Sequence, residues 1–226
     1  MSDIKLLASV PIFSELTSLE LEELSFRMSR QRYKKNNMIL MEDEFGDTFF
    51  IISKGIVKIT RISEEGREVI LAMLGEGDFF GEMSLLDGET RSANAIAFDD
   101  AEVLILKRHD FIDLLQKYPK IAISLLAEMA SRIRKSDHQI ESLSLSDAEH
   151  RIGMTLMRLA EDLGTIHHGV VEITKMPYQQ DLASMAGTSR ETVSRMLKLL
   201  EKKGMIKRQA HTLSIQDFTL FKRTFS

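Results

Sequence analysis

The chain has 226 residues, of which 43% are hydrophobic and 28% are charged, as expected of a globular protein long enough for two modest domains. The absence of cysteine excludes disulfides, cysteine-ligated iron–sulfur clusters and cysteine nucleophiles, while the lack of a long apolar run or a signal-peptide pattern favours a cytoplasmic protein without membrane contact. The net charge of −4 is uneven, because residues 147–226 hold 12 Lys and Arg against 9 Asp and Glu, an asymmetry expected when one end of a chain binds nucleic acid.

Residues 30–108 are expected to form β-structure, because short apolar runs recur about every ten residues. The runs are Asn37–Met41, Thr48–Ile52, Ile56–Ile62, Glu68–Leu74, Asn94–Ala97 and Ala101–Leu106. Turn signals such as Gly46-Asp47, Glu65-Gly66 and Asp87-Gly88 separate them. This rhythm predicts an antiparallel sandwich of the jelly-roll kind.

The segment FFGEMSLLDGETRSANAIA, residues 79–97, combines residues that suit a polar ligand. Gly81 allows close backbone approach and Glu82 offers a carboxylate, while Arg91 beside Ser92 suits a phosphate through charge-assisted hydrogen bonds. A short turn after Glu82 would add backbone N–H donors. A salt bridge between Glu82 and Arg91 that merely stitches a loop fits the same residues, and the sequence leaves both readings open.

A heptad seam begins after Tyr118-Pro119 and continues for about three heptads. Its members are Ala122, Leu126, Met129, Ile133, Ser136, Ile140 and Leu143. A parallel homodimer is the simplest partner for such a seam, the alternative being that the stripe packs only on its own sandwich. Ser136 interrupts the seam, which predicts that a polar group lies there.

The segment LSLSDA, residues 143–148, is expected to be a hinge, with Ser146 as the N-cap of a helix that continues through Leu163. His167-His168 is interpreted as a surface turn before a strand over residues 170–174. The six histidines lack ligand spacing, so no metal is expected.

Residues 178–203 predict a helix-turn-helix. The first helix is expected from Gln179 to Met185 and Gly187 supplies the turn. Thr188 is expected to cap the second helix, forming a capping box with Glu191. Val193, Met196, Leu197 and Leu200 form the stripe to be buried, Gly204 ends the helix, and residues 205–215 predict a wing.

The exposed start of the second helix would carry side chains that read base edges. They are Ser189, Arg190, Glu191, Ser194 and Arg195. Arg can donate two hydrogen bonds to guanine and Glu can accept one from cytosine, although Glu191 could also serve only the capping box. Lys198, Lys202 and Lys203 are better placed for phosphates.

The run SRETVSRMLKLLEKKGMI resembles the recognition helix of the CRP/FNR, or catabolite-activator, family, and the likeness spans nearly the whole chain. The resemblance implies an α+β fold with a β-roll sensor domain over residues 1–118, a dimerisation helix over residues 119–144 and a winged helix-turn-helix domain over residues 145–226. It implies a near-palindromic operator on double-stranded DNA with half-sites akin to TGTGA, and contact with RNA polymerase through loops such as residues 161–169. Arg190, Glu191 and Arg195 fall at the family's base-contacting positions, with Gln179, Thr188, Ser189, Ser194 and Lys198 around them.

The run FGE-x(8)-RSA is similar to the phosphate-binding cassette of the family's cyclic-nucleotide domain. The resemblance implies that a cyclic nucleotide, cyclic AMP or cyclic GMP, is the allosteric effector. The residues implied are Gly81, Glu82, Met83, Arg91, Ser92, Ala93, Ser136 and Asp137. Asp137 departs from the catabolite activator, which has a hydroxyl there, and this bears on the choice between adenine and guanine.

Other functions fit these residues less well. A metal-dependent enzyme on the sandwich would need a cluster of His and carboxylate ligands, and only His109 lies near the β-region. A regulatory subunit for a kinase or channel would not need the helix-turn-helix. A DNA-binding regulator that senses haem, 2-oxoglutarate or a cyclic dinucleotide, or nothing, remains the alternative.

Overall fold

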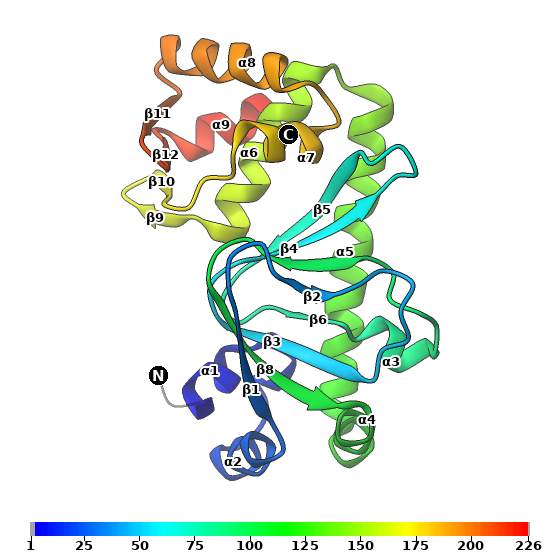
Figure 1. The fold of residues 1–226 in the computed structure, drawn as a ribbon. Coiled ribbons are helices and arrows are strands. Elements are labelled where there is room, and N and C mark those ends of the chain that lie inside the picture. The colour runs from blue at the N-terminus through cyan, green and yellow to red at the C-terminus, as the bar shows by residue number, and fades with distance from the viewer. Residues whose placement is uncertain (1–2, 226) are drawn as a thin grey trace. The chain divides into compact units, whose positions relative to one another are not determined.

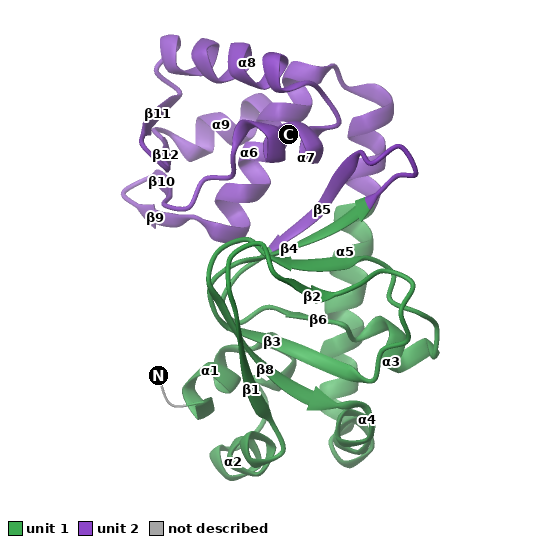
Figure 2. Cartoon of the chain, viewed as in Figure 1, with its two compact units in different colours: residues 1–61, 74–136 green, residues 62–73, 137–226 purple. Residues whose placement is uncertain are grey.

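The computed structural model of the chain describes residues 3–225. The chain divides into two compact units, one of residues 1–61 and 74–136, the other of residues 62–73 and 137–226 (Figure 2). No helix within the described residues is both long and apolar enough to cross a membrane.

The first half of the chain forms two four-stranded antiparallel sheets, ordered β1-β8-β3-β6 and β2-β7-β4-β5 (Figure 1). The strands are β1 (Ser29–Tyr33), β2 (Met38–Leu40), β3 (Thr48–Lys54), β4 (Val57–Ile62), β5 (Glu68–Leu74), β6 (Phe79–Phe80), β7 (Asn94–Ala97) and β8 (Ala101–Lys107). The helices here are α1 (Asp3–Ser9), η1 (Pro11–Phe13), α2 (Ser18–Phe26), α3 (Met83–Asp87) and α4 (Arg108–Lys117). The predicted α+β fold with an antiparallel β-sandwich is confirmed.

Strand β3 shows why this sandwich forms, because both of its faces are buried. Phe49 and Ile51 point into a core shared with the helices, whereas Phe50 and Ile52 point into a second core between the sheets. The Phe49 ring stacks on Phe111 of α4 with centroids 4.7 Å apart. The continuous apolar run of β3 is therefore explained by burial of the strand on both faces.

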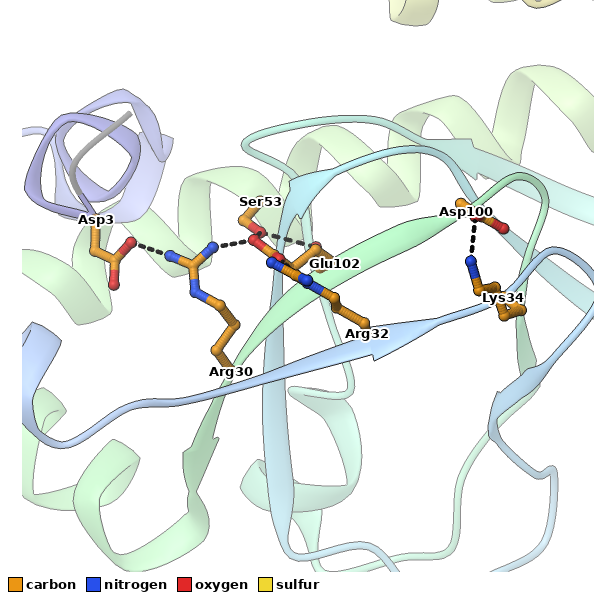
Figure 3. Close-up of polar contacts among 7 residues, drawn as sticks. All are labelled: Asp3, Arg30, Arg32, Lys34, Ser53, Asp100 and Glu102. Carbon is orange, nitrogen blue, oxygen red and sulfur yellow. Dashed lines mark hydrogen bonds and ion pairs between the residues drawn. The ribbon is translucent and has the colours of Figure 1, made fainter.

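Strand β1 lies at the start of the predicted β-region but was not among the predicted runs, because its sequence SRQRY is polar. It lies at the edge of its sheet and is held by ion pairs to β8 (Figure 3). Glu102 accepts hydrogen bonds from Arg30, from Arg32 at 2.6 Å and from Ser53 at 3.1 Å, and Arg30 also pairs with Asp3. Pairing with a neighbouring strand, rather than its own hydrophobicity, makes this segment a strand.

Helix α5 (Pro119–Leu145) is a single helix of 27 residues. Ile121 and Leu125 are buried in the first unit's core. The seam residues Leu126, Ile133, Ile140 and Leu143 are instead 57–68% exposed. Met129 of the seam packs partly against that core, but the four exposed residues contradict the alternative in which the stripe packs only on its own sandwich.

The second half of the chain contains a helix-turn-helix and a four-stranded sheet of order β11-β12-β10-β9. The elements are α6 (Ala148–Leu163), β9 (Thr165–His167), β10 (Val170–Ile173), α7 (Gln179–Ala186), α8 (Arg190–Lys202), β11 (Ile206–Gln209), β12 (Thr212–Ile215) and α9 (Phe218–Phe225). The expectation that Ser146 caps α6 is wrong. Asp147 is the cap, and its carboxylate accepts from the His150 backbone N–H at 2.8 Å because the helix begins one residue later than expected.

Candidate ligand-binding and DNA-binding sites

A buried polar cradle lies where β6 ends and α3 begins. Gly81 follows Phe80 with a φ of +83°, in the left-handed region that favours glycine. A Cβ at this position would lie 2.9 Å from Nη1 of Arg91 and 3.1 Å from the Thr48 carbonyl oxygen. The glycine therefore lets the backbone approach the Arg91 guanidinium.

Arg91 is the centre of this cradle and is only 4% exposed. Its Nη1 donates to the Gly81 carbonyl at 2.6 Å and to Ser84 Oγ at 2.8 Å, while Nη2 donates to the Thr48 carbonyl at 2.8 Å. Nε is buried and has no hydrogen-bond partner. A Cβ on Gly46 would overlap this guanidinium, so the space beside Nε depends on a second glycine.

Glu82 is 3% exposed and pairs with Arg132 of α5 rather than with Arg91. Its Oε1 lies 3.2 Å from Nη1 of Arg132, whose Nη2 donates to the Phe79 carbonyl at 2.9 Å. Oε2 is buried and has no partner. Burial raises the pKa of Glu82, while the charges of Arg132 and Arg91 act in the opposite direction. The loop-stitching salt bridge between Glu82 and Arg91 is therefore not what the structure shows.

The cradle fits a ligand that carries both a hydroxyl and a phosphate. The unpartnered Oε2 of Glu82 can accept from a hydroxyl, and the unpartnered Nε of Arg91 can donate to an anion. Buried polar groups without partners are rare in proteins and call for an explanation, of which a ligand is one. Among the described residues no group of His, Asp and Glu could hold a metal ion.

The other residues predicted for this site are placed as follows. Ser92 is exposed and its Oγ lies 3.7 Å from Sδ of Met83, while Ala93 is half-buried. Ser136 is exposed and donates to the carbonyl of Arg132, one turn earlier on α5, at 3.1 Å. Asp137 is exposed and belongs to the second unit. The structure thus brings Gly81, Glu82 and Arg91 together, and the hydrogen bond of Ser136 lies within α5 itself.

Sequence reasoning missed Arg132 and Thr48 as parts of this cradle. Arg132 looked like one of several charges on the outer face of a heptad helix, and its contact with Glu82 joins residues 50 positions apart. Its position one turn before Ser136 was the only local signal. Thr48 offered none, because its backbone carbonyl makes the contact.

The helix-turn-helix consists of α7, a turn at Gly187 and α8. Gly187 has a φ of +58° and ends α7. The expectation that Thr188 caps α8 in a box with Glu191 is wrong, because the cap is Ser189, whose Oγ accepts from the Thr192 backbone N–H at 3.2 Å. Helix α8 starts at Arg190, so Glu191 is its second residue and not the third, which is the position that a capping box requires.

Arg151 of α6 fixes the turn of this motif. Its guanidinium donates to the carbonyls of Ala186 at 2.9 Å, Ser146 at 2.8 Å and Gly187 at 3.1 Å. The residue therefore ties the segment after α5 to the turn that precedes the recognition helix. The sequence reading had assigned it no role.

The outer face of α8 presents the side chains predicted to read bases. Arg190, Glu191, Arg195 and Lys198 are exposed, as is the cap Ser189, while Ser194, Thr188 and Gln179 are half-buried. Val193, Met196, Leu197 and Leu200 are buried on the opposite face, as predicted. The Glu191 side chain accepts hydrogen bonds from the Glu191 backbone N–H and from the Ser189 side chain, and these hold its pKa below the ordinary value. Glu191 is therefore a carboxylate at neutral pH.

A β-roll with a buried Glu–Arg cradle, followed by a winged helix-turn-helix, defines a class of sensory DNA-binding protein, and comparison with known proteins agrees. Residues 30–118 match the model of the cyclic nucleotide-binding domain, and residues 150–223 match that of the Crp-like helix-turn-helix domain. The chain belongs to the CRP/FNR family of transcription regulators, which are DNA-binding proteins and not enzymes.

Two relatives and one structural neighbour show the extent of this likeness. The chain is 33% identical to the cyclic AMP receptor protein of Thermus thermophilus over 93% of this chain and 94% of that protein. It is 34% identical to the cAMP-activated global transcriptional regulator CRP of Escherichia coli O6:H1 over 81% and 88%. The solved structure of the c-di-GMP-responsive regulator CLP of Xanthomonas campestris is 23% identical, covers 86% of this chain and 97% of its own, has a TM-score of 0.71 and shows the same fold.

Proposed function

We propose that this regulator binds DNA under the control of a cyclic nucleotide, with cyclic AMP as the first candidate. The observation that carries the proposal is the pair of buried atoms without partners, Oε2 of Glu82 and Nε of Arg91, in one cradle. An acceptor and a donor held together suit the ribose hydroxyl and the cyclic phosphate of such a ligand. Ser92, Met83, Ala93 and the Gly81 backbone complete the proposed site.

The effector's base is proposed to lie against Ser136 and Asp137. Relatives are named for cyclic AMP, and a structural neighbour for c-di-GMP. A carboxylate at residue 137 can accept a hydrogen bond from the adenine amino group or from N1–H and N2–H of guanine. Cyclic GMP and cyclic di-GMP are therefore the rival effectors, and haem and 2-oxoglutarate are more distant ones.

Thermal stabilisation of the full-length protein tests this proposal. A ligand at a hundred times its Kd stabilises the folded state by about 2.7 kcal/mol, which raises the midpoint of melting. We expect cyclic AMP to produce this shift in the wild type but not in Glu82→Ala, which loses the acceptor. Failure of all three nucleotides to shift the wild type would leave only an effector of another class or none.

The exposed seam of α5 is proposed to pair with a second copy of the chain. Leu126, Ile133, Ile140 and Leu143 recur at heptad spacing and are more than half exposed. A symmetric dimer would present two recognition helices, so we propose a near-palindromic operator with half-sites about one helical turn apart. Ile133→Glu is expected to give a monomer in sedimentation and to weaken operator binding, whereas Arg134→Glu on an exposed neighbouring position should do neither.

Recognition is proposed to depend on Arg190, Glu191 and Arg195 at base edges, with Lys198 on phosphate. Gln179, Thr188, Ser189 and Ser194 would lie against the backbone beside them. The Arg–Glu–Arg pattern supports TGTGA-like half-sites. Selection from a random duplex pool would reveal the half-site directly, and a motif without guanine or cytosine at the central positions would contradict this assignment.

In the proposed mechanism, residues 1–118 sense the ligand, the helix of residues 119–144 pairs the copies, and residues 145–226 bind DNA. Ligand and DNA must raise each other's affinity by the same factor. Action on DNA supports a cytoplasmic location, and the loop of residues 161–169 is the proposed contact for RNA polymerase. Measuring DNA affinity with and without cyclic AMP, and ligand affinity with and without DNA, checks this reciprocity.

A further inference from the structure

The 13 methionines carry all of the sulfur in this chain, because the sequence has no cysteine. Among the described residues three methionines are exposed, Met38, Met41 and Met83, with exposed fractions of 41–49%. Oxidation of methionine to its sulfoxide requires that an oxidant reach the sulfur, so these three are the accessible positions. Met83 differs from the other two because its sulfur contacts a residue of the proposed ligand site.

The contact of Met83 lies at the exposed edge of the cradle. Met83 is the first residue of α3, and its Sδ accepts a hydrogen bond from the Ser92 hydroxyl at 3.7 Å. Both side chains are exposed. Their chain neighbours are Glu82 and Arg91, whose buried Oε2 and Nε atoms have no partner. A ligand that satisfies these two atoms would therefore lie beside the hydroxyl that the methionine sulfur holds.

The strength of the acceptor at residue 83 decides where the Ser92 hydroxyl donates. A thioether sulfur is a weak acceptor, and a serine hydroxyl has a single proton to donate. A phosphate oxygen is a much stronger acceptor, so it takes this hydroxyl from the sulfur at little cost. Oxidation converts the apolar thioether into a polar sulfoxide, whose oxygen competes with the phosphate for the same proton.

We propose that Met83 is an oxidation site through which hydrogen peroxide weakens effector binding. The sulfur lone pair attacks one peroxide oxygen, so that an S–O bond forms as the O–O bond breaks. The proton of the transferred oxygen passes to the leaving oxygen, which departs as water, and sulfur loses the two electrons that the peroxide gains. Methionine sulfoxide reductases reverse the change. The inference rests on the proposed function, because it needs a phosphate-bearing ligand beside Ser92.

Peroxide treatment of the full-length protein tests the proposal. Mass spectrometry of its peptides would report the sulfoxide at each methionine. Calorimetry would measure the affinity for cyclic AMP, or for cyclic GMP if only that nucleotide binds, in treated and untreated samples of each variant. The wild type should lose about tenfold in affinity on oxidation, the effect of one hydrogen bond to a charged group, and should regain it after treatment with methionine sulfoxide reductase.

Four variants, each compared with its own untreated sample, separate this mechanism from general oxidation. Met83→Leu removes the sulfur and should show no change on oxidation, whereas the control Met38→Leu, which removes an exposed sulfur on β2, should keep the tenfold loss. Ser92→Ala should also show no change, because the contested hydroxyl is gone. Met83→Gln has a carbonyl oxygen in place of the sulfoxide oxygen, so without oxidant it should bind about tenfold more weakly than Met83→Leu.

Two kinds of failure are distinguishable in this experiment. Unchanged affinity of a wild type that carries the sulfoxide at Met83, or a tenfold loss that persists in Ser92→Ala, would overturn the oxidation mechanism and leave the proposed function standing. Failure of the untreated wild type to bind either nucleotide would overturn the proposed function and this inference with it. Melting curves would confirm that each sample is folded.

Discussion

The buried cradle and the recognition helix use the same residue types in opposite environments. In the cradle Glu82 and Arg91 are 3% and 4% exposed, whereas Arg190, Glu191 and Arg195 are exposed on α8. Burial raises the pKa of Glu82, while hydrogen bonds lower that of Glu191. The cradle charges are largely paired with neighbouring groups of the protein and therefore contribute to the fold, while the exposed charges of α8 remain open to a partner. Substitutions at the two places should separate stability from binding.

The largest effect on stability is expected from substitution of Arg91. Arg91→Ala leaves the carbonyls of Gly81 and Thr48 and the Ser84 hydroxyl without their donor, beside the buried Glu82. We expect the free energy of unfolding to fall by about 3–5 kcal/mol, the usual cost of removing one member of a buried charged network. Urea denaturation followed by fluorescence or circular dichroism would measure it, and a loss below about 1 kcal/mol would show that the cradle relaxes without its guanidinium.

Arg195→Ala is the opposite case. The side chain is exposed and its only hydrogen bond among the described residues is to Thr192 Oγ1 at 3.3 Å, so stability should change by less than about 0.5 kcal/mol. Operator binding should weaken by roughly 1–3 kcal/mol, with relaxed preference at one guanine. Binding to duplexes with each base at that position would test it, with Lys198→Ala as a control that weakens all sequences alike. An unchanged base preference would remove Arg195 from the reading face.

The recognition helix was easier to predict from the sequence than the cradle, because its contacts join residues that are close together in the chain. The buried stripe of α8 and the turn at Gly187 follow from spacings of three or four residues. The contact of Arg132 with Glu82 spans 50 residues, and no local pattern encodes it. Strand β1 shows the same limit, because its polar sequence becomes a strand only through β8.

The cap of α8 shows a different limit. Thr188 and Ser189 are adjacent hydroxyl residues, and the spacing from Thr188 to Glu191 favoured the wrong one. Nothing local distinguishes them, because either start leaves the same apolar stripe buried. The structure places the cap at Ser189 through the bond to the Thr192 N–H.

That correction predicts a moderate effect. Ser189→Ala should lower the free energy of unfolding by about 1 kcal/mol, the usual cost of losing a helix cap. Thr188→Ala should cost clearly less, because Thr188 makes no capping bond to α8. Paired thermal melts of the two variants would decide, and an equal or larger loss in Thr188→Ala would restore the original assignment.

The smallest contrast is expected in the pH dependence of stability, and it has opposite signs in the two regions. Because burial raises the pKa of Glu82 above its ordinary value of 4.5, the folded protein binds a proton there more readily than the unfolded chain. Its contribution to stability therefore falls as the pH rises from 4.5 through the folded pKa. Glu191 has a lowered folded pKa, so its contribution is present above 4.5 and is lost as the pH falls from 4.5 through the lower folded pKa.

Replacing each Glu by Gln should reveal these signs. Relative to the wild type, Glu82→Gln should gain stability as the pH rises from acid to neutral, whereas Glu191→Gln should lose it. Unfolding free energies of the wild type and both variants, measured across that pH range, provide the test. If the change in unfolding free energy with pH had the same sign in both variants, the buried carboxylate of Glu82 and the exposed carboxylate of Glu191 would not have opposite pKa shifts.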